Sequence, residues 1–277
     1  MNNKAILTYI NSGKDLIEFS FLWKTWLMWD INEQWDIIVI SEVDLKDYEH
    51  DNLTVYQNFE DNTENLAKYD FLFKTECGSF LTPNIKEFEP WKDKMYLGIG
   101  THYQMGGDET LTSLRSIIRK IADRLNLPYR DISHIGNSII GGSKVVINTL
   151  KTQKAISGYI NTNGWKKEED GVVGGWHRKY VNEYALDLAV NSILQPISVH
   201  QGSIDVWCGF NKITSLDLHI TCNEHSNQDG VFSKEKFHSG ELPKIKYNKI
   251  PATTTEYCFF IANSDLGYLK SLVENTI

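Results

Sequence analysis

Residues 69–83 have the sequence Tyr-Asp-Phe-Leu-Phe-Lys-Thr-Glu-Cys-Gly-Ser-Phe-Leu-Thr-Pro, and this stretch decides the fold. Its apolar and aromatic part, up to Thr75, predicts a short buried strand. Glu76 stands where that strand ends, and the glycine and serine after it allow the chain to turn. In α/β proteins, ligands and metal ions bind at the carboxyl ends of strands. Glu76 is therefore a candidate binding residue, with a solvated carboxylate as the alternative.

The chain on either side of this stretch alternates between strand and helix patterns. Apolar residues at helical spacing predict a helix that begins at Asp15, with its three tryptophans in the core. The run at 36–41 is apolar on both faces, which indicates a parallel sheet covered by helices on both sides. Further apolar runs predict strands at 5–10, 53–56, 94–100, 134–142, 216–221 and 257–261.

Helix patterns occupy much of the second half. They predict helices at 110–127, 143–157 and 176–191, and a last helix after the capping residues 263–265. The loop at 165–175 is rich in glycine and enters its helix at Trp-His, a pattern that indicates a closing lid. The predicted fold class is α/β, with a mostly parallel central sheet flanked by helices.

Composition sets limits on the class of protein. The chain has 277 residues, 41% of them hydrophobic and 12% aromatic, which suits one large α/β domain, alone or with a small appendage, and excludes wholesale disorder. Its four cysteines lack paired spacing, which indicates free thiols in a reducing compartment. No signal pattern or membrane-spanning run is found, so we expect a cytoplasmic protein with no membrane partner.

Charge is distributed unevenly along the chain. The formal net charge is −8, yet residues 1–110 hold 9 Lys or Arg against 20 Asp or Glu, whereas the remainder holds 19 against 16. Only the second half is therefore expected to tolerate a polyanion, near Arg115, Arg119 and the lysines of 234–249. No G-x-G-x-x-G or G-x-x-x-x-G-K-[ST] motif occurs, which argues against dehydrogenases and P-loop enzymes.

Four motifs, taken in order, resemble the nucleotide-diphospho-sugar transferases of the GT-A fold, and in particular an uncharacterised glycosyltransferase-like family of viruses and eukaryotes. Residues 74–83 are similar to its Thr-Asp-x-Asp-x-Phe-Leu-Thr-Pro motif. The segment 135–138, the Trp-His at 176–177 with Leu-Ala-x-Asn at 188–191, and the Leu-His at 218–219 are the other three.

This resemblance implies one GT-A-like, Rossmann-type domain over 1–277, with a nucleotide-sugar-binding half at 1–100 and an acceptor-side half with a C-terminal tail at 101–277. It implies transfer of a sugar from a nucleotide donor, with a UDP-sugar favoured, to a hydroxyl acceptor. In such enzymes two acids hold Mn²⁺ or Mg²⁺ against the donor diphosphate, because a hard cation prefers several oxygen ligands.

The sequence departs from the motif at one of these two acids. Glu76 replaces the first acid, but Gly78 replaces the second and has no side chain. Three interpretations follow. Glu76, His219 and the donor phosphates hold the metal; or Arg or Lys neutralises the diphosphate without a metal; or the protein binds a sugar nucleotide without transferring it.

The resemblance also implies roles for individual residues. The predicted donor contacts are Asn11, Ser12, Lys14, Thr75, Glu76 and Gly78. The predicted metal ligands are Glu76 and His219. The predicted acceptor-side residues are Asn137, Trp176, His177 and Tyr184. One of Asp170, Glu183 and Asp187 is expected to be the catalytic base.

The acceptor stays open at this point. A hydroxymethylated pyrimidine in phage DNA is one candidate, which would place the protein in a host cytoplasm, and glycans or proteins are the others. Two further classes are a non-catalytic module that binds sugar nucleotides or glycans, and a nucleotidyltransferase, which the lack of a glycine-rich phosphate loop disfavours.

Overall fold

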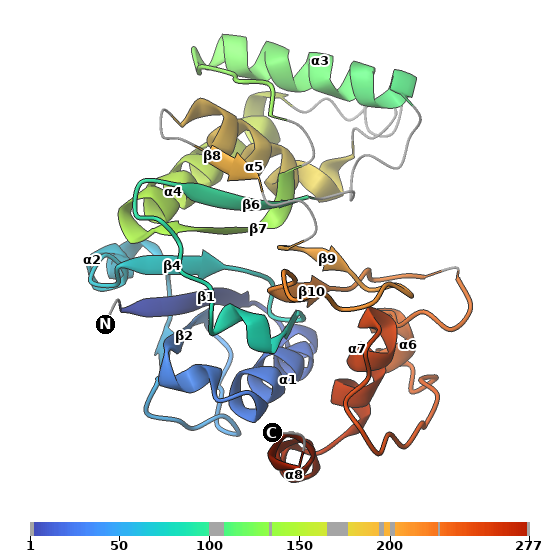
Figure 1. Cartoon of the computed structure of the whole chain (residues 1–277). Coiled ribbons are helices and arrows are strands. Elements are labelled where there is room, and N and C mark those ends of the chain that lie inside the picture. The colour runs from blue at the N-terminus through green and yellow to red at the C-terminus, as the bar shows by residue number, and fades with distance from the viewer. Residues whose placement is uncertain are drawn as a thin grey trace.

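The computed structural model describes residues 3–99, 108–132, 135–164, 177–193, 197–199, 203–226 and 228–275. Its central sheet has seven strands, β1 (Lys4–Ile10), β2 (Trp35–Ser41), β3 (Leu53–Tyr56), β4 (Phe71–Lys74), β6 (Met95–Ile99), β7 (Ile135–Gly142) and β8 (Ile197–Val199). They lie in the order β3-β2-β1-β4-β7-β6-β8 (Figure 1). Four of the six neighbouring pairs are parallel, and β7 runs antiparallel to β4 and β6. The predicted α/β class is confirmed.

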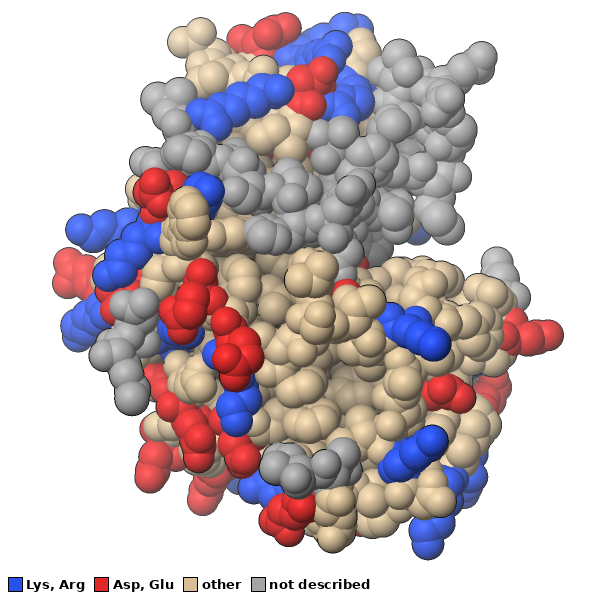
Figure 2. Space-filling view, viewed as in Figure 1, with Lys and Arg blue, Asp and Glu red and all other residues tan. Residues whose placement is uncertain are grey.

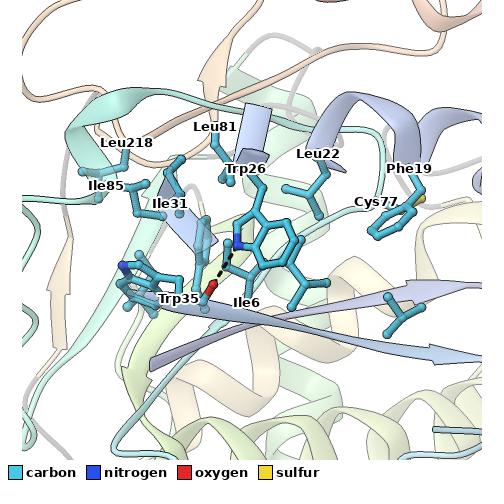
Figure 3. Close-up of a cluster of buried hydrophobic side chains, with 14 of the residues drawn as sticks. Ile6, Phe19, Leu22, Trp26, Ile31, Trp35, Cys77, Leu81, Ile85 and Leu218 are labelled. Atoms are coloured by element: carbon cyan, nitrogen blue, oxygen red, sulfur yellow. Dashed lines mark hydrogen bonds between the residues drawn. The ribbon is translucent and has the colours of Figure 1, made fainter. Parts of the chain in front are cut away.

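One face of this sheet is covered by α1 (Gly13–Met28), whose apolar residues point at the strands. Trp26 is fully buried there, and its Nε1 donates to the carbonyl of Trp35 at 2.6 Å (Figure 3). A buried indole N–H needs such an acceptor. Trp23 and Trp29 pack partly buried against the same cluster, so the predicted tryptophan core is confirmed.

The other face is covered by α4 (Ser143–Tyr159) and α5 (Val181–Ser192), which pack on the alternate residues of the same strands. α3 (Asp108–Arg124) packs on α5, farther from the sheet (Figure 1). The short α2 (Thr63–Leu66) precedes β4. A sheet buried on both faces accounts for the apolar runs of β1 and β2.

A second, three-stranded sheet lies beside the first and carries the C-terminal helices. It contains β5 (Phe80–Leu81), β10 (His219–Thr221) and β9 (Val206–Trp207), in that order. The helices that pack on it are α6 (Lys234–His238), α7 (Thr254–Asn263) and α8 (Leu266–Glu274). Phe80 of β5 stacks on Phe21 of α1 with ring centroids 4.7 Å apart, which ties this unit to the first half of the chain.

A buried polar network joins the two sheets. Asp205 accepts at Oδ2 from the backbone N–H of Ser138 in β7, at 3.0 Å, and its own N–H donates to Nδ1 of His219 in β10, at 3.1 Å. Asp205 adopts a left-handed backbone, with φ of 57°. Its carboxylate occupies the space that side chains at Gly98 and Gly136 would fill, so both glycines are required by this close approach.

One expectation from the sequence needs correction. Residues 257–261 form part of α7 and not a strand, because the Thr253-x-x-Glu256 spacing is a helix-start signal that outweighs a short apolar run.

The four cysteines are free, as expected. Three of them meet in space: the sulfurs of Cys208, Cys222 and Cys258 all lie within 4.8 Å of one another in the apolar core of the C-terminal unit.

The predicted lid at 165–175 and Trp176 lie outside the described residues. Within the described part of the chain, no helix is long and apolar enough to cross a membrane.

The close approach at Gly136 predicts a specific cost. A Cβ there would lie 2.0 Å from Oδ2 of Asp205, so Gly136→Ala should displace that carboxylate and lower the free energy of unfolding by about 1–3 kcal/mol. Gly158, on the exposed side of α4, has no atom within 4 Å of an added Cβ. Gly158→Ala should therefore raise stability by about 0.5–1 kcal/mol. Urea unfolding followed by circular dichroism measures both, and equal stability of Gly136→Ala and the parent would contradict the network.

Candidate functional site

A pocket of about 350 Å³ opens at the carboxyl ends of β1 and β4. The residues after these strands contribute to it together with residues of α1, α4, α5 and α6. Its lining is polar for the most part, namely Tyr9, Asn11, Asp15, Glu18, Lys74, Thr75, Glu76, Cys77, Asn137, Gln153, Asn182, Glu183, Leu186 and Lys234. Glu76, the residue that the sequence places after a strand end, is part of this lining.

The turn after β4 fixes the position of Glu76. The backbone N–H of Thr75 donates to the carbonyl of Leu7 at 3.0 Å, which extends the pairing of β4 with β1 by one residue. The hydroxyl of Ser79 then donates to the carbonyl of Glu76 at 2.6 Å and closes the turn. Glu76 is thus presented at the end of the strand by backbone hydrogen bonds on both sides.

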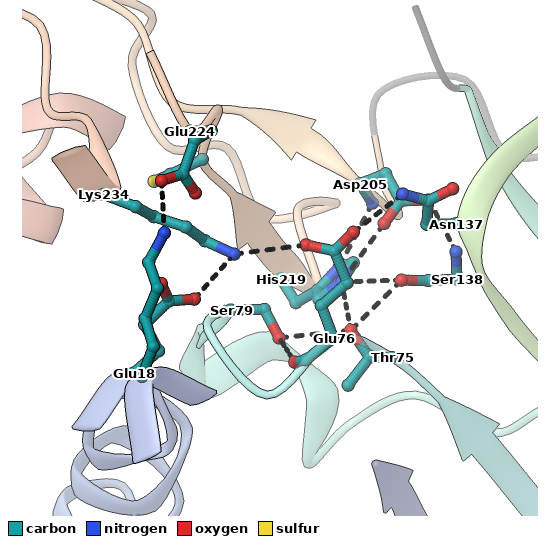
Figure 4. Close-up of polar contacts among 12 residues, drawn as sticks. Glu18, Thr75, Glu76, Ser79, Asn137, Ser138, Asp205, His219, Glu224 and Lys234 are labelled. Atoms are coloured by element: carbon teal, nitrogen blue, oxygen red, sulfur yellow. Dashed lines mark hydrogen bonds and ion pairs between the residues drawn. The ribbon is translucent and has the colours of Figure 1, made fainter. Parts of the chain in front are cut away.

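The carboxylate of Glu76 contacts polar side chains of β7 and α6 in the pocket. Its Oε1 accepts from Nδ2 of Asn137 at 2.7 Å, and its Oε2 lies 3.5 Å from Nζ of Lys234 (Figure 4). The Glu76 side chain is 30% exposed, so it borders both the protein interior and the pocket.

Lys234 is a buried cation at the edge of the pocket. Its Nζ lies 3.0 Å from Oε2 of Glu18, and the two side chains are only 11% and 5% exposed. Glu18 is held in turn by Nε2 of His238 at its other oxygen, at 2.8 Å. Burial alone would lower the pKa of Lys234, but the carboxylates of Glu76 and Glu18 outweigh it and hold that pKa above its ordinary value. The Lys234 side chain is therefore an ammonium at neutral pH.

Gly78 borders the same ammonium. A Cβ built on Gly78 would lie 2.5 Å from Oε2 of Glu18 and 2.8 Å from both Cε and Nζ of Lys234. The space that a second motif acid would enter is therefore filled by a lysine and its partner carboxylate.

His219 lies behind the pocket and has both ring nitrogens in hydrogen bonds. It is fully buried; its Nδ1 accepts from the N–H of Asp205, and its Nε2 lies 2.9 Å from Oγ1 of Thr75 and 3.1 Å from Oγ of Ser138. Burial lowers its pKa below the usual value, against the opposing effect of Asp205, so the ring is neutral. With Nδ1 as an acceptor, the proton of a neutral ring sits on Nε2, which leaves no lone pair there for a metal.

These groups do not fit the divalent metal that the sequence motif implies. Glu76 faces an ammonium, Gly78 supplies no ligand, and Nε2 of His219 carries a proton. A hard divalent cation needs several oxygen or nitrogen lone pairs in reach. We therefore assign no step to a metal at Glu76.

The predicted donor contacts around the start of α1 have separate roles. Asn11 lines the pocket, and its backbone N–H donates to Oδ2 of Asp15 at 2.9 Å. Ser12 caps α1 by accepting from the N–H of Asp15 at 3.2 Å. Lys14 forms an ion pair with Glu224, which connects α1 to the C-terminal unit.

The predicted acceptor-side residues separate into two groups. Asn137 and Glu183 line the pocket. Asp187 is 4% exposed and accepts from Tyr129 and Asn191, among the residues where α3 packs on α5, so of the described candidate bases only Glu183 lies at the pocket.

The other acceptor-side predictions lie farther away or outside the described residues. The hydroxyl of Tyr184 is buried and accepts from the N–H of His177 at 3.0 Å. Trp176 and Asp170 lie outside the part of the chain that the structure describes.

Sequence reasoning missed Glu18, Lys74 and the role of Lys234. Glu18 lies on the side of α1 that carries Leu22 and other buried residues. An acid on a buried helix face predicts a basic partner inside the protein. Lys74 is the last residue of β4, and its Nζ donates to the carbonyl of Asn137 at 2.7 Å. Lys234 looks like one of several tail lysines, so no local pattern distinguishes it.

Comparisons with known proteins agree with this fold. Among solved structures, the chain is similar to the bifunctional glycosyltransferase WbbM in its apo form, with 10% identity and a TM-score of 0.51 over 99% of this chain and 51% of that one. It is also similar to GlyE of Streptococcus pneumoniae TIGR4, at 8% identity and a TM-score of 0.45 over 100% and 64%. The galactosyltransferase LgtC follows at 6% identity and 0.41 over 72% and 74%.

At these identities the likeness concerns the fold alone, and this chain spans about half the length of WbbM. The mixed α/β sheet flanked by helices matches the GT-A glycosyltransferase fold.

Two sequence comparisons complete these findings. The comparison with curated proteins finds no match. The family model of a domain of unknown function, DUF7164, matches residues 37–266. Since this match covers most of the chain, the protein belongs to the DUF7164 family.

Proposed function

We propose that this protein transfers a sugar from a nucleoside diphosphate sugar, with a uridine nucleotide favoured, to a hydroxyl acceptor. The observation that carries the proposal is the polar pocket at the carboxyl ends of β1 and β4, where ligands bind in open α/β sheets. The fold supports it, because WbbM, which has a similar fold, is a bifunctional glycosyltransferase.

The donor is proposed to lie along the ends of β1 and β4. Its nucleotide would contact Asn11, and its diphosphate would reach the turn at Glu76–Ser79. Two lysines, Lys74 and Lys234, line this part of the pocket. Burial lowers the pKa of Lys74 below its ordinary value, against the opposing effect of nearby acids, so an anionic ligand would favour its charged form.

The acceptor is proposed to enter beside α5. Glu183 is the described acid on that helix that lines the pocket, and in an inverting reaction it would accept the proton of the attacking hydroxyl. The hydroxyl oxygen forms the new bond to the anomeric carbon as the bond from that carbon to the phosphate oxygen breaks. The electron pair of the broken bond leaves with the nucleoside diphosphate.

The charge distribution favours a glycan or protein acceptor over DNA. Arg115 and Arg119, which the sequence suggested as a basic face, both pair with Asp131. Lys234 is buried against Glu18. In the view of Figure 2, the described basic side chains lie mixed with acidic ones at the top and along the left side, and uncharged residues cover most of the centre. DNA binding relies on unpaired basic residues that displace counterions from phosphates.

The second candidate function is a module that binds a sugar nucleotide without transferring it. The observation that favours it is Gly78, which leaves the motif without its second acid. The two functions share the donor site and differ only in turnover.

Glu183→Gln is expected to distinguish them. If Glu183 is the base, the variant should release nucleoside diphosphate about 10²- to 10⁴-fold more slowly while it binds the donor as the parent does. The measurement is the rate at which nucleoside diphosphate is released from each of a panel of sugar nucleotides, with glycan, protein and hydroxymethylated DNA as acceptors. Glu235→Gln, at an exposed acid of α6, is the control and should match the parent.

Three outcomes decide the matter. Turnover that depends on Glu183 supports a transferase. Donor binding without turnover for any acceptor supports the binding module. No binding of any sugar nucleotide refutes both.

A further inference from the structure

The side chain of Lys234 lies directly beside Gly78, the residue that the resemblance aligns with the second acid of the motif. We propose that the ammonium of Lys234, held between Glu18 and Glu76, replaces the metal ion against the diphosphate of the donor. This inference rests on the proposed function and deepens it, because it names the group that neutralises the leaving nucleotide.

The first argument is space. Gly78 stands where the motif has its second acid, and any Cβ there would meet Lys234 and Glu18 at 2.8 Å and 2.5 Å. The ends of the Lys234 and Glu18 side chains therefore occupy the space that an acidic side chain at position 78 would need. An acid at position 78 requires the ends of both side chains to move from their present places.

The second argument is charge. Glu18 and Glu76 form ion pairs with Lys234, whose Nζ lies 3.0 Å and 3.5 Å from their carboxylates. A divalent ion bound to Glu76 at this place would have to displace the ammonium. That would leave a cation 11% exposed without its partners, which is strongly unfavourable.

The third argument is what the ammonium can offer a ligand. It has three N–H donors, and the two carboxylate oxygens account for two of them. Lys234 also lines the pocket, so a phosphate oxygen can take the remaining donor. As the sugar–phosphate bond breaks, negative charge grows on the leaving phosphate oxygen, and a fixed cation beside it stabilises that charge.

Lys74 lines the same pocket. When an anionic donor favours its charged form, Lys74 would add a second positive charge beside that of Lys234. Glu18 holds Lys234 in place, and the carbonyl of Asn137 holds Lys74. These contacts would orient the two amines toward the diphosphate, as metal coordination would otherwise do.

Calorimetric binding of nucleotides tests the proposal without reference to turnover. The probe is whichever of UDP, GDP, CDP and ADP binds most tightly. Its dissociation constant is measured beside that of the corresponding nucleoside, once in EDTA and once in Mn²⁺. For the parent protein we expect the dissociation constant of the diphosphate to be the same in both solutions. Lys234→Met should weaken diphosphate binding about 10- to 100-fold, since it removes a hydrogen bond to a charged group, and should leave nucleoside binding unchanged.

Two variants guard against a merely structural effect. Lys236→Met, two residues along α6, should bind the diphosphate as the parent does. Gly78→Asp combined with Lys234→Ala restores the second acid and removes the lysine from its space, and the end of the Glu18 side chain, 2.5 Å from the new Cβ, has to turn aside. We expect this double variant to bind the diphosphate in Mn²⁺ and to lose at least tenfold in affinity in EDTA, which the parent does not.

The outcomes separate this inference from the proposed function. Binding of a diphosphate that needs Mn²⁺ in the parent, with no loss in Lys234→Met, overturns the role of Lys234 and leaves the donor site intact. Equal weakening of nucleoside and diphosphate by Lys234→Met makes the lysine purely structural and also overturns it. No diphosphate binding under any condition overturns the donor site itself.

Discussion

The site depends on the two ion pairs that Lys234 forms, one with Glu18 and one with Glu76. They bring together three parts of the chain that are distant in sequence: α1, the turn after β4, and α6. Removal of one partner from a buried pair typically costs about 3–5 kcal/mol, because a charge is left uncompensated. The same ion pairs that organise the pocket therefore also tie the C-terminal unit to the central sheet.

A second constraint lies directly behind the first. His219 connects β10 to Thr75, the residue after β4, and to Ser138 of β7 through hydrogen bonds in the protein interior. It therefore holds the end of β4 against the second sheet, next to the turn that presents Glu76.

Much of the fold was predictable because it follows from local patterns. The strands of β1, β2 and β3 and the helix α1 appear in the sequence as apolar runs and helical spacing, and Glu76 follows β4 at the edge of the sheet where the pocket lies. The helix α7 was not found, because a short, wholly buried apolar run has no period that separates helix from strand.

The site was predictable only in part, since its contacts span long sequence distances. Gly78 shows in the sequence that an acid is missing, but not what fills its space. Lys234 lies 158 residues from Glu76 and resembles its neighbouring lysines until the fold places it. Asp187 and Glu183 are equivalent in the sequence as acids on one helix face, and only packing shows that one is enclosed with Tyr129 while the other lines the pocket.

The most direct test of the central claim is a crystal structure of the protein grown with its nucleoside diphosphate and Mn²⁺, with diffraction data collected at the manganese absorption edge. The account predicts a β-phosphate oxygen within hydrogen-bond distance of Nζ of Lys234 and no anomalous peak between Glu76 and the phosphates. A manganese peak at that place, with Lys234 displaced from Glu18, would contradict it.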